Sequence, residues 1–288
     1  MIAPEETNQP AISQLIAYVN EQIELLAFDE PAPKLLEQMV DGLADPRPSI
    51  RLSLIEAFGQ IGEPATPFLM EGLAHQATTT ARQACCHALS NIGDPQAVSG
   101  LVQALRNDTD IVVKGAAATA LASVGQSAFA PLCEVLASET ADASCKGQAA
   151  WAIASMSSEI SEQLYDAVND PSPTVRTAVI GAIAQLARQH KDPKASKTIR
   201  QALSDPSSEV RIEAAADLAR LNDQDAYQIL VKLLTDPDAE VRKSVILALG
   251  KFDREGTIQT ITPLIKDPSP QVQRVATLVV TQLQSQTK

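Results

Sequence analysis

Apolar residues recur along the chain at helical spacing, in short stretches that polar turns separate. In residues 205–221, Val210, Ala214 and Leu218 follow one another at intervals of four and form one apolar stripe on a helix. A second, shorter stripe lies in residues 226–233. Pro206 breaks the pattern before the first stripe, because proline lacks a backbone N–H and restricts the residue before it. The pattern predicts pairs of antiparallel helices, here called the A and B helices of a repeat.

One phrase, Asp-Pro-x-x-x-Val-Arg, marks the turn before the B helix and returns along the chain. Copies begin at Asp45, Asp170, Asp205 and Asp236, and a copy without the arginine begins at Asp267. The basic position, or a glutamine in its place, falls at residues 51, 82, 114, 146, 176, 211, 242 and 273. A fixed period of this size predicts a solenoid, since one helix pair cannot bury both stripes alone and neighbours must share a core. We expect the Asp to cap a helix and the Arg to bind the Asp of a neighbouring repeat.

This period, with Asp-Pro and Val-Arg at these offsets, resembles the HEAT repeat over about residues 35–285. The predicted fold is all-α, an α-solenoid of about eight HEAT-like helical hairpins with an N-terminal capping helix. An amphipathic helix over residues 12–26 would supply the cap, so the expected organisation is a tail and capping helix in residues 1–34 and the solenoid in residues 35–288. Residues 188–193 lengthen one interval and are predicted to be a loop insertion.

Charge is distributed unevenly along the chain. The formal net charge is −12; residues 1–144 contain 6 Lys+Arg and 18 Asp+Glu, whereas residues 145–288 contain 17 of each. A basic stripe for nucleic acid or an anionic membrane is missing, so both partners are disfavoured. The acidic half would serve either for docking or for solubility alone. No signal peptide, spanning apolar run or CxxC spacing is present, which favours a cytoplasmic location without membrane insertion.

Aligning the B helices on Val-Arg separates the core from a candidate binding face. With Val as position 0, the core takes positions 0, 4, 5 and 8, and position 6 points almost opposite, toward the concave surface of such a solenoid. Positions 6 and 2 supply two candidate surfaces for a ligand or a protein partner. The first contains the only Trp of the chain and small residues that open a groove: His87, Thr119, Trp151, Gly115 and Gly147. The second is an apolar strip of Ile212, Leu247 and Leu278.

Each surface has a simpler interpretation. Trp151 offers a stacking face and His87 a polar contact for a flat ligand or a partner anchor, but Trp151 would equally fill the gap that Gly115 and Gly147 leave. The apolar strip suits a partner helix, but a C-terminal cap or self-association would equally cover it. The residues themselves leave these alternatives open.

Cys85-Cys86-His87 is the most tempting catalytic or metal-binding sequence. Adjacent residues on a helix point about 100° apart, so these three side chains cannot converge alone. Cys85 and Cys86 occupy core positions 4 and 5, and we interpret them as buried small hydrophobic residues. Because no Ser/His/Asp order, phosphate-binding loop or metal-ligand spacing is present, we predict no catalytic residue and no metal site.

Residues 81–95, with Ala-Arg, Ala-Leu and Ile-Gly-Asp-Pro at characteristic positions, are similar to a segment of the phycobilisome lyase (E/F-type) HEAT-like proteins, and the turn at 62–69 resembles their inter-repeat turn. The resemblance covers about 35 residues. It implies a phycobilin as transient cofactor, and a phycobiliprotein subunit or a second HEAT-repeat chain as partner. The family commonly has Trp at the position of Ala84 and Arg at that of His87, and both departures favour a protein that is not an enzyme.

The favoured function is therefore a non-catalytic scaffold or chaperone that binds protein along its concave face, for phycobiliproteins or for phycobilisome assembly or turnover. One alternative is a bilin lyase subunit that attaches or detaches a tetrapyrrole at a phycobiliprotein cysteine. Another is a general protein–protein adaptor unrelated to phycobilisomes.

Overall fold

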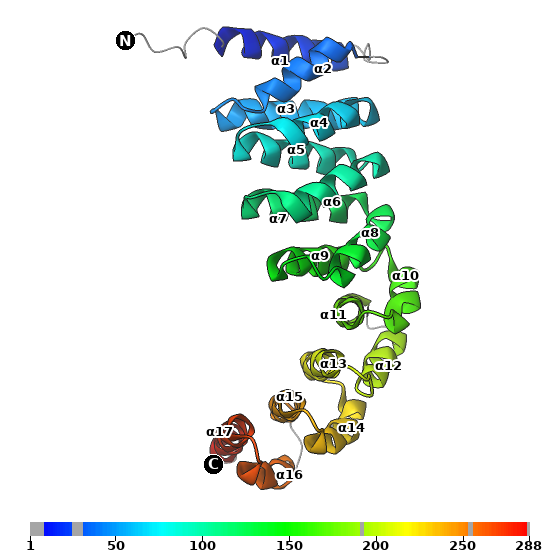
Figure 1. Ribbon diagram of the computed structural model, residues 1–288, viewed down its shortest axis with the longest axis vertical. Coiled ribbons are helices and arrows are strands. Elements are labelled where there is room, and N and C mark those ends of the chain that lie inside the picture. Colours follow the sequence, from blue (N-terminus) through cyan, green and yellow to red (C-terminus); the bar gives the residue numbers. More distant parts are fainter. Residues whose placement is uncertain (1–8, 25–30, 191–192, 253–255, 287–288) are drawn as a thin grey trace, which may run out of the picture. The chain divides into compact units, whose positions relative to one another are not determined.

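The computed structural model describes residues 9–24, 31–190, 193–252 and 256–286. Over these residues the chain is all-α, without a strand, and A and B helices alternate as predicted for an α-solenoid (Figure 1). The chain divides into two compact units, an N-terminal unit of residues 1–152 and a C-terminal unit of residues 153–288. The predicted division into a capping segment and a solenoid at residue 34 stays a prediction.

The N-terminal unit begins with α1 (Gln9–Glu24), the helix expected at the start of the chain. The predicted end of this helix at residue 26, and the first eight residues of the expected tail, lie outside the described residues. Its A helices are α2 (Pro33–Gly42), α4 (Thr66–His75), α6 (Val98–Asn107) and α8 (Gln126–Ala137). Its B helices are α3 (Pro48–Ile61), α5 (Thr79–Ile92), α7 (Ile111–Val124) and α9 (Ala143–Ser155), whose last turn enters the C-terminal unit. The 3-10 turns η1 (Glu63–Ala65) and η2 (Pro95–Ala97) lead into α4 and α6.

The C-terminal unit repeats this order with shorter A elements. These are α10 (Ser161–Asp166) with η3 (Ala167–Asn169), α12 (Pro193–Ala202), α14 (Tyr227–Lys232) between η4 (Gln224–Ala226) and η5 (Leu233–Thr235), and α16 (Thr257–Ile261) with η6 (Thr262–Lys266). The B helices are α11 (Pro173–His190), α13 (Ser208–Arg220), α15 (Ala239–Leu249) and α17 (Pro270–Gln286).

The loop insertion predicted at residues 188–193 is wrong for its first three residues, because α11 continues through His190. Arginine and glutamine are good helix formers, and Arg188 Nη2 donates to Gln185 Oε1, one turn earlier, at 2.5 Å. The extra residues therefore lengthen the helix, and residues 191–192 lie outside the described part of the chain.

Within each unit the B helices pack directly on one another and bury the predicted stripe. In α13, Val210, Ala214, Ala215 and Leu218 are all buried, which are positions 0, 4, 5 and 8. Small residues permit the close packing of neighbouring elements. At Gly72 on α4, for example, an added Cβ would lie 2.5 Å from Val40 Cγ1.

The Asp and Arg of the repeated phrase form a ladder of ion pairs between successive repeats. Arg211 Nε and Nη2 each donate to a carboxylate oxygen of Asp236, at 2.9 Å, and Arg211 Nη1 donates to the carbonyl of Asp205 at 2.9 Å. The same bidentate pairing joins Arg82 to Asp108, Arg176 to Asp205 and Arg242 to Asp267. The predicted pairing of Arg with the Asp of a neighbouring repeat is confirmed for these four arginines, whereas Arg51 donates to the carbonyl of Asp45 in its own repeat, at 2.7 Å.

The ladder aspartate was expected to cap the B helix, but the N-cap residue lies two positions after it. Asp205 Oδ1 accepts the N–H of Ser207 at 2.8 Å, and Ser207 is itself the residue before α13. Asp236 bonds the N–H of Asp238 in the same way, and the side chain of Asp238 then caps α15. The ladder aspartate therefore fixes the turn that precedes the helix rather than the helix end, because it lies two residues before the N-cap, with the proline between them.

Candidate functional site

The first candidate surface lies on the exposed face of the B helices of the N-terminal unit. His87 on α5, Thr119 on α7 and Trp151 on α9 are all exposed, and 49% of Trp151 is accessible to solvent. The Thr119 hydroxyl donates to the carbonyl of Gly115 at 3.0 Å, which holds it against its own helix. The position-6 side chains thus lie at the surface in this unit, and their role in binding stays a prediction.

The two glycines of this surface have little around them. An added Cβ at Gly147 would meet nothing within 4 Å, and one at Gly115 would meet only the side-chain amide of Gln148, at 3.7 Å for its nitrogen. Trp151 is not among these neighbours. The alternative in which Trp151 fills the glycine gap is therefore not what the structure shows.

Two further apolar residues of this unit are exposed, although neither belongs to the predicted site. Leu52 on α3 and Val112 on α7 are 56% and 49% exposed. Val112 occupies position −1, which on a helical wheel lies about 20° from position 6, so the sequence did contain the signal. Positions 2 and 6 of α3, α5, α7 and α9 contain no Lys or Arg. This face therefore combines polar and apolar side chains and lacks a permanently charged cation.

The second candidate surface lies on the B helices of the C-terminal unit. Leu247 on α15 and Leu278 on α17 are 45% and 63% exposed, whereas Ile212 on α13 is half-buried. A cavity of about 330 Å³ opens between α13, α15 and α17, and Leu247 lines it. Ile212 and Leu278 do not line this cavity, so the structure brings only one of the three predicted residues into its wall.

A buried carboxylate lies one residue from this cavity. Asp217 is 1% exposed; its Oδ1 accepts from Arg220 Nη1 at 2.5 Å, and its Oδ2 has no hydrogen-bond partner among the described residues. Burial, reinforced by the charge of Glu213, raises the pKa of Asp217 to about 7, although Arg220 acts in the opposite direction. Asp217 therefore changes its charge near neutral pH.

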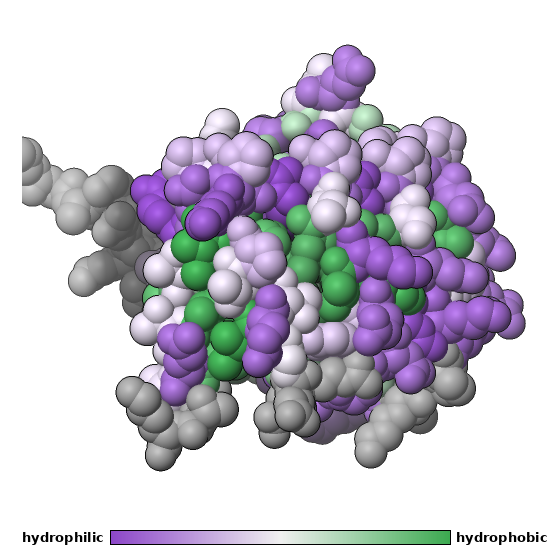
Figure 2. All heavy atoms as spheres, turned by 90° about the horizontal axis from the view of Figure 1, so that it is seen from below, coloured by the Kyte–Doolittle hydropathy of each residue, from purple (hydrophilic) through white to green (hydrophobic). Residues whose placement is uncertain are grey.

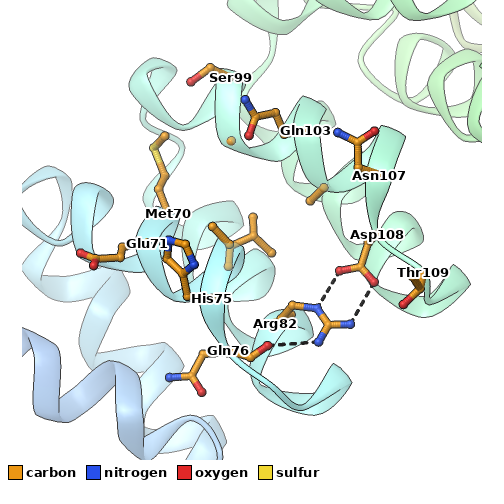
Figure 3. Close-up of a pocket in the computed structure, with 14 residues that line it drawn as sticks. Met70, Glu71, His75, Gln76, Arg82, Ser99, Gln103, Asn107, Asp108 and Thr109 are labelled. Carbon is orange, nitrogen blue, oxygen red and sulfur yellow. Dashed lines mark hydrogen bonds and ion pairs between the residues drawn. The ribbon is translucent and has the colours of Figure 1, made fainter.

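A cavity of about 700 Å³ between α4 and α6 was not predicted at all (Figure 3). Polar side chains surround it, among them Glu71, His75, Gln103 and Asn107. Arg82, at one end, does not offer a free cation. Its Nε and Nη2 donate to Asp108 at 2.7 and 3.0 Å, and its Nη1 donates to the carbonyl of Gln76 at 3.1 Å. The basic group of this cavity thus belongs to the ladder.

The cysteines do not form a reactive centre. Cys85 and Cys86 are fully buried, while His87 points to the surface, as their separation on a helix requires. Burial raises the pKa of the Cys85 thiol to about 12 and also raises that of Cys86, so both stay protonated at neutral pH. The interpretation of these residues as core hydrophobes is confirmed.

The described residues include no group of three His, Cys, Asp or Glu side chains that is placed to hold a metal ion. None of the described helices combines the length and the apolar character that crossing a bilayer requires.

The chain is similar in sequence to one bilin biosynthesis protein and aligns with several solved structures. It is 33% identical over 190 residues to the bilin biosynthesis protein MpeU of Synechococcus sp. (strain WH8020), a match that covers 66% of this chain and 64% of that protein. The complex of CpcE and CpcF of phycocyanin lyase from Nostoc sp. PCC7120 aligns with a TM-score of 0.33 and 18% identity, over 88% of this chain and 97% of that one. Human deoxyhypusine hydroxylase, in complex with glycerol, aligns with a TM-score of 0.37 and 17% identity, over 86% and 96% of the two chains. At such TM-scores neither structure bears on what this chain does.

The family comparison agrees with the architecture. The model of HEAT repeats matches residues 32–122 and 196–281, and a second HEAT repeat model matches residues 160–190. These segments contain the turns and the ladder described above. The chain belongs to the HEAT repeat family.

Proposed function

We propose that this protein is a non-catalytic binding protein that holds a phycobiliprotein subunit on the exposed B-helix face of its N-terminal unit. The observation that carries the proposal is the 49% exposure of Trp151, four residues after Gly147, where an added Cβ would meet nothing within 4 Å. Tryptophan is among the residues that dominate the binding energy of protein interfaces. The exposed Leu52 on α3 and Val112 on α7 add apolar surface on other B helices of the same unit.

The kind of partner follows from the related protein. The 33% identity to a bilin biosynthesis protein supports a partner that carries, or will receive, a bilin. A protein surface suits this face better than a free bilin does. Bilins have two propionate groups, which need cationic partners, and positions 2 and 6 of these B helices contain no Lys or Arg.

A non-catalytic role is supported by the state of the nucleophiles. Thiolate is the reactive form of cysteine, and the pKa of Cys85 lies at about 12 in the core. His87 is exposed and separated from both neighbouring thiols.

A second candidate function is that of a bilin lyase subunit that works with another HEAT-repeat chain. The relative named for bilin biosynthesis and the flat, half-exposed ring of Trp151 favour it, because a tetrapyrrole stacks on aromatic faces. A general adaptor unrelated to phycobilisomes is the third candidate, since HEAT solenoids support many functions.

The test measures binding of a purified phycobiliprotein subunit, with and without its bilin, to the full chain by biolayer interferometry. Trp151→Ala should weaken binding by about tenfold or more, as loss of an interface anchor does. Tyr18→Ala is the matched control, because Tyr18 is an equally exposed aromatic residue of the same unit, at 50%. Equal affinities of the Trp151→Ala variant and the wild type would show that this face is not the site.

Free phycocyanobilin separates the three candidates. Because Trp151 is the only Trp of the chain, its emission reports directly on a pigment bound beside it. Quenching with a saturable, red-shifted absorbance band would support bilin handling, and zinc fluorescence of a denatured phycobiliprotein band after mixing would identify a lyase. If the chain binds neither the phycobiliprotein subunit nor the pigment, the general adaptor is the candidate function that remains.

A further inference from the structure

We propose that the C-terminal unit carries a second interaction surface, which takes one large apolar side chain of an acidic amphipathic helix into the cavity between α13, α15 and α17. This surface is independent of the Trp151 face, and it involves different residues in the other compact unit. The partner is identified by three features of the surface: the size of the cavity, the exposed leucines around it and the sign of the unpaired charges.

The cavity is small and has an apolar base. Its volume is about 330 Å³, at the lower end of the roughly 300–1,000 Å³ typical of small-molecule sites. Ala216, Ala219, Ala248 and Gly250 line it, and their small side chains make the hollow. The space suits a single side chain of a protein partner and is too small for an extended tetrapyrrole.

Two exposed leucines on the helices that form the cavity would gain free energy if a partner covered them. Leu247 lines the opening and is 45% exposed, and Leu278 on the neighbouring helix is 63% exposed. Each gains roughly 25 cal/mol for every Å² that a partner removes from water. Figure 2, which faces the C-terminal end of the chain, shows apolar atoms in hollows between hydrophilic side chains.

The charges around the cavity select an acidic partner. Arg220, which is 49% exposed, and the exposed Lys251 both line the opening. The nearby carboxylates, Glu213 and Asp217, are both bound to Arg220. Within the described residues, neither Lys251 at the opening nor the exposed Arg274, four residues before Leu278 on α17, makes an ion pair. Complementary rim charges of this kind orient a partner and accelerate its association.

A helix fits this surface better than an extended peptide. An amphipathic helix binds by placing its apolar face into a hydrophobic groove, and the described part of this chain has no strand edge to which an extended peptide could add. Arg274 lies four residues before Leu278, and Leu247 lies four residues before Lys251, so each B helix presents one leucine and one cation on the same face. An amphipathic helix with an apolar stripe flanked by Glu would match both the two leucines and the two cations.

The test uses two fluorescein-labelled synthetic helical peptides of equal length with the same leucine stripe, one flanked by Glu and the other by Lys. Fluorescence anisotropy measures their affinity for the full chain. The double variant Lys251→Glu/Arg274→Glu should weaken binding of the Glu peptide by about tenfold or more, because two attractions become two repulsions. Lys232→Glu/Lys266→Glu is the matched control, since it makes the same charge change at exposed A-element positions; its affinity should stay within about twofold of the wild type.

A cavity variant tests the apolar part separately. Ala216→Met fills the hollow from a half-buried position, and circular dichroism verifies that it folds. It should weaken the Glu peptide without altering the preference for Glu over Lys. Equal binding of both peptides, no saturable binding of the Glu peptide, or an equal loss in the charge control would each overturn the proposal. Self-association of the protein alone that Leu278→Glu abolishes would instead assign the surface to a second copy of this chain.

Discussion

The ladder pair Arg82–Asp108 gives a quantitative prediction for the variant Arg82→Met. The side chains of the two residues are only 15% and 7% exposed. Methionine removes two charge-assisted bonds to the carboxylate and the bond to the Gln76 carbonyl. Asp108 then keeps only the N–H of Asp110, at 2.9 Å, in addition to the more distant charge of Lys114. Removing one partner of a buried pair costs roughly 3–5 kcal/mol; because this pair is not fully buried, we expect about 3 kcal/mol at neutral pH.

The pH dependence of that loss has a definite sign. The hydrogen bonds from Arg82 hold the pKa of Asp108 below its ordinary value, and an Asp in the unfolded chain titrates near about 3.9. A depressed carboxyl pKa contributes stability that is fully present above the unfolded pKa and is lost as pH falls through the folded pKa. The difference in unfolding free energy between wild type and Arg82→Met should therefore be largest at neutral pH and shrink below about pH 4.

Urea unfolding followed by circular dichroism at neutral and at acidic pH measures this difference. Arg106→Met is the matched control, because it removes the same charge from the exposed Arg106, which makes one bond of 3.3 Å to a backbone carbonyl. We expect the control to change stability by less than about 0.5 kcal/mol. The reasoning fails if the two variants lose equal stability at neutral pH, or if the Arg82→Met loss is the same at both pH values.

Four further predictions concern individual positions. Gly72→Ala should destabilise the protein by about 1–3 kcal/mol, because its Cβ would lie 2.5 Å from Val40 Cγ1. Gly147→Ala should stabilise the protein by about 0.5–1 kcal/mol, since the added Cβ would meet nothing within 4 Å and alanine favours the helix. The urea midpoints of the two variants should therefore shift in opposite directions, and a shift of both in the same direction would contradict these two predictions. Cys85, with its pKa at about 12, should escape iodoacetamide in the native protein and react in urea, as mass spectrometry of that site will show. The folded pKa of Asp217, about 7, lies above the unfolded value of about 3.9, so its charge opposes folding increasingly between about pH 4 and 7. Asp217→Asn should thus gain stability over wild type across that range in urea melts, and a gain independent of pH would refute the assignment.

The repeated phrase was enough to predict the fold because each repeat carries its own turn, stripe and ladder residues. In α13, the stripe predicted from Val210, Ala214 and Leu218 is buried in the structure. The end of α11 was misplaced, because an interval longer than the period does not say whether the additional residues are loop or helix. Arg188 continues the helix, which extends to His190, and the next described helix begins at Pro193.

The candidate surfaces were predictable to the extent that they depend on one helix. Exposure of Trp151 and Leu247 follows from the helical wheel of each B helix. The cavity between α4 and α6 depends instead on the distance between two helices. Its opening depends on Gly100, where an added Cβ would lie 3.1 Å from Met70 Cε. A sequence pattern within one repeat does not contain that spacing.

The regular ladder also makes the C-terminal repeats interchangeable parts. Arg176 binds Asp205, and Arg211 binds Asp236, through the same bidentate contact. If residues 205–235 were excised, Asp236 would follow Leu203 and Ser204 at the place that Asp205 now occupies, and Arg176 would find an equivalent carboxylate. A chain built in this way can be shortened or extended by whole repeats without redesigning any junction, which makes its length an adjustable property of the molecule.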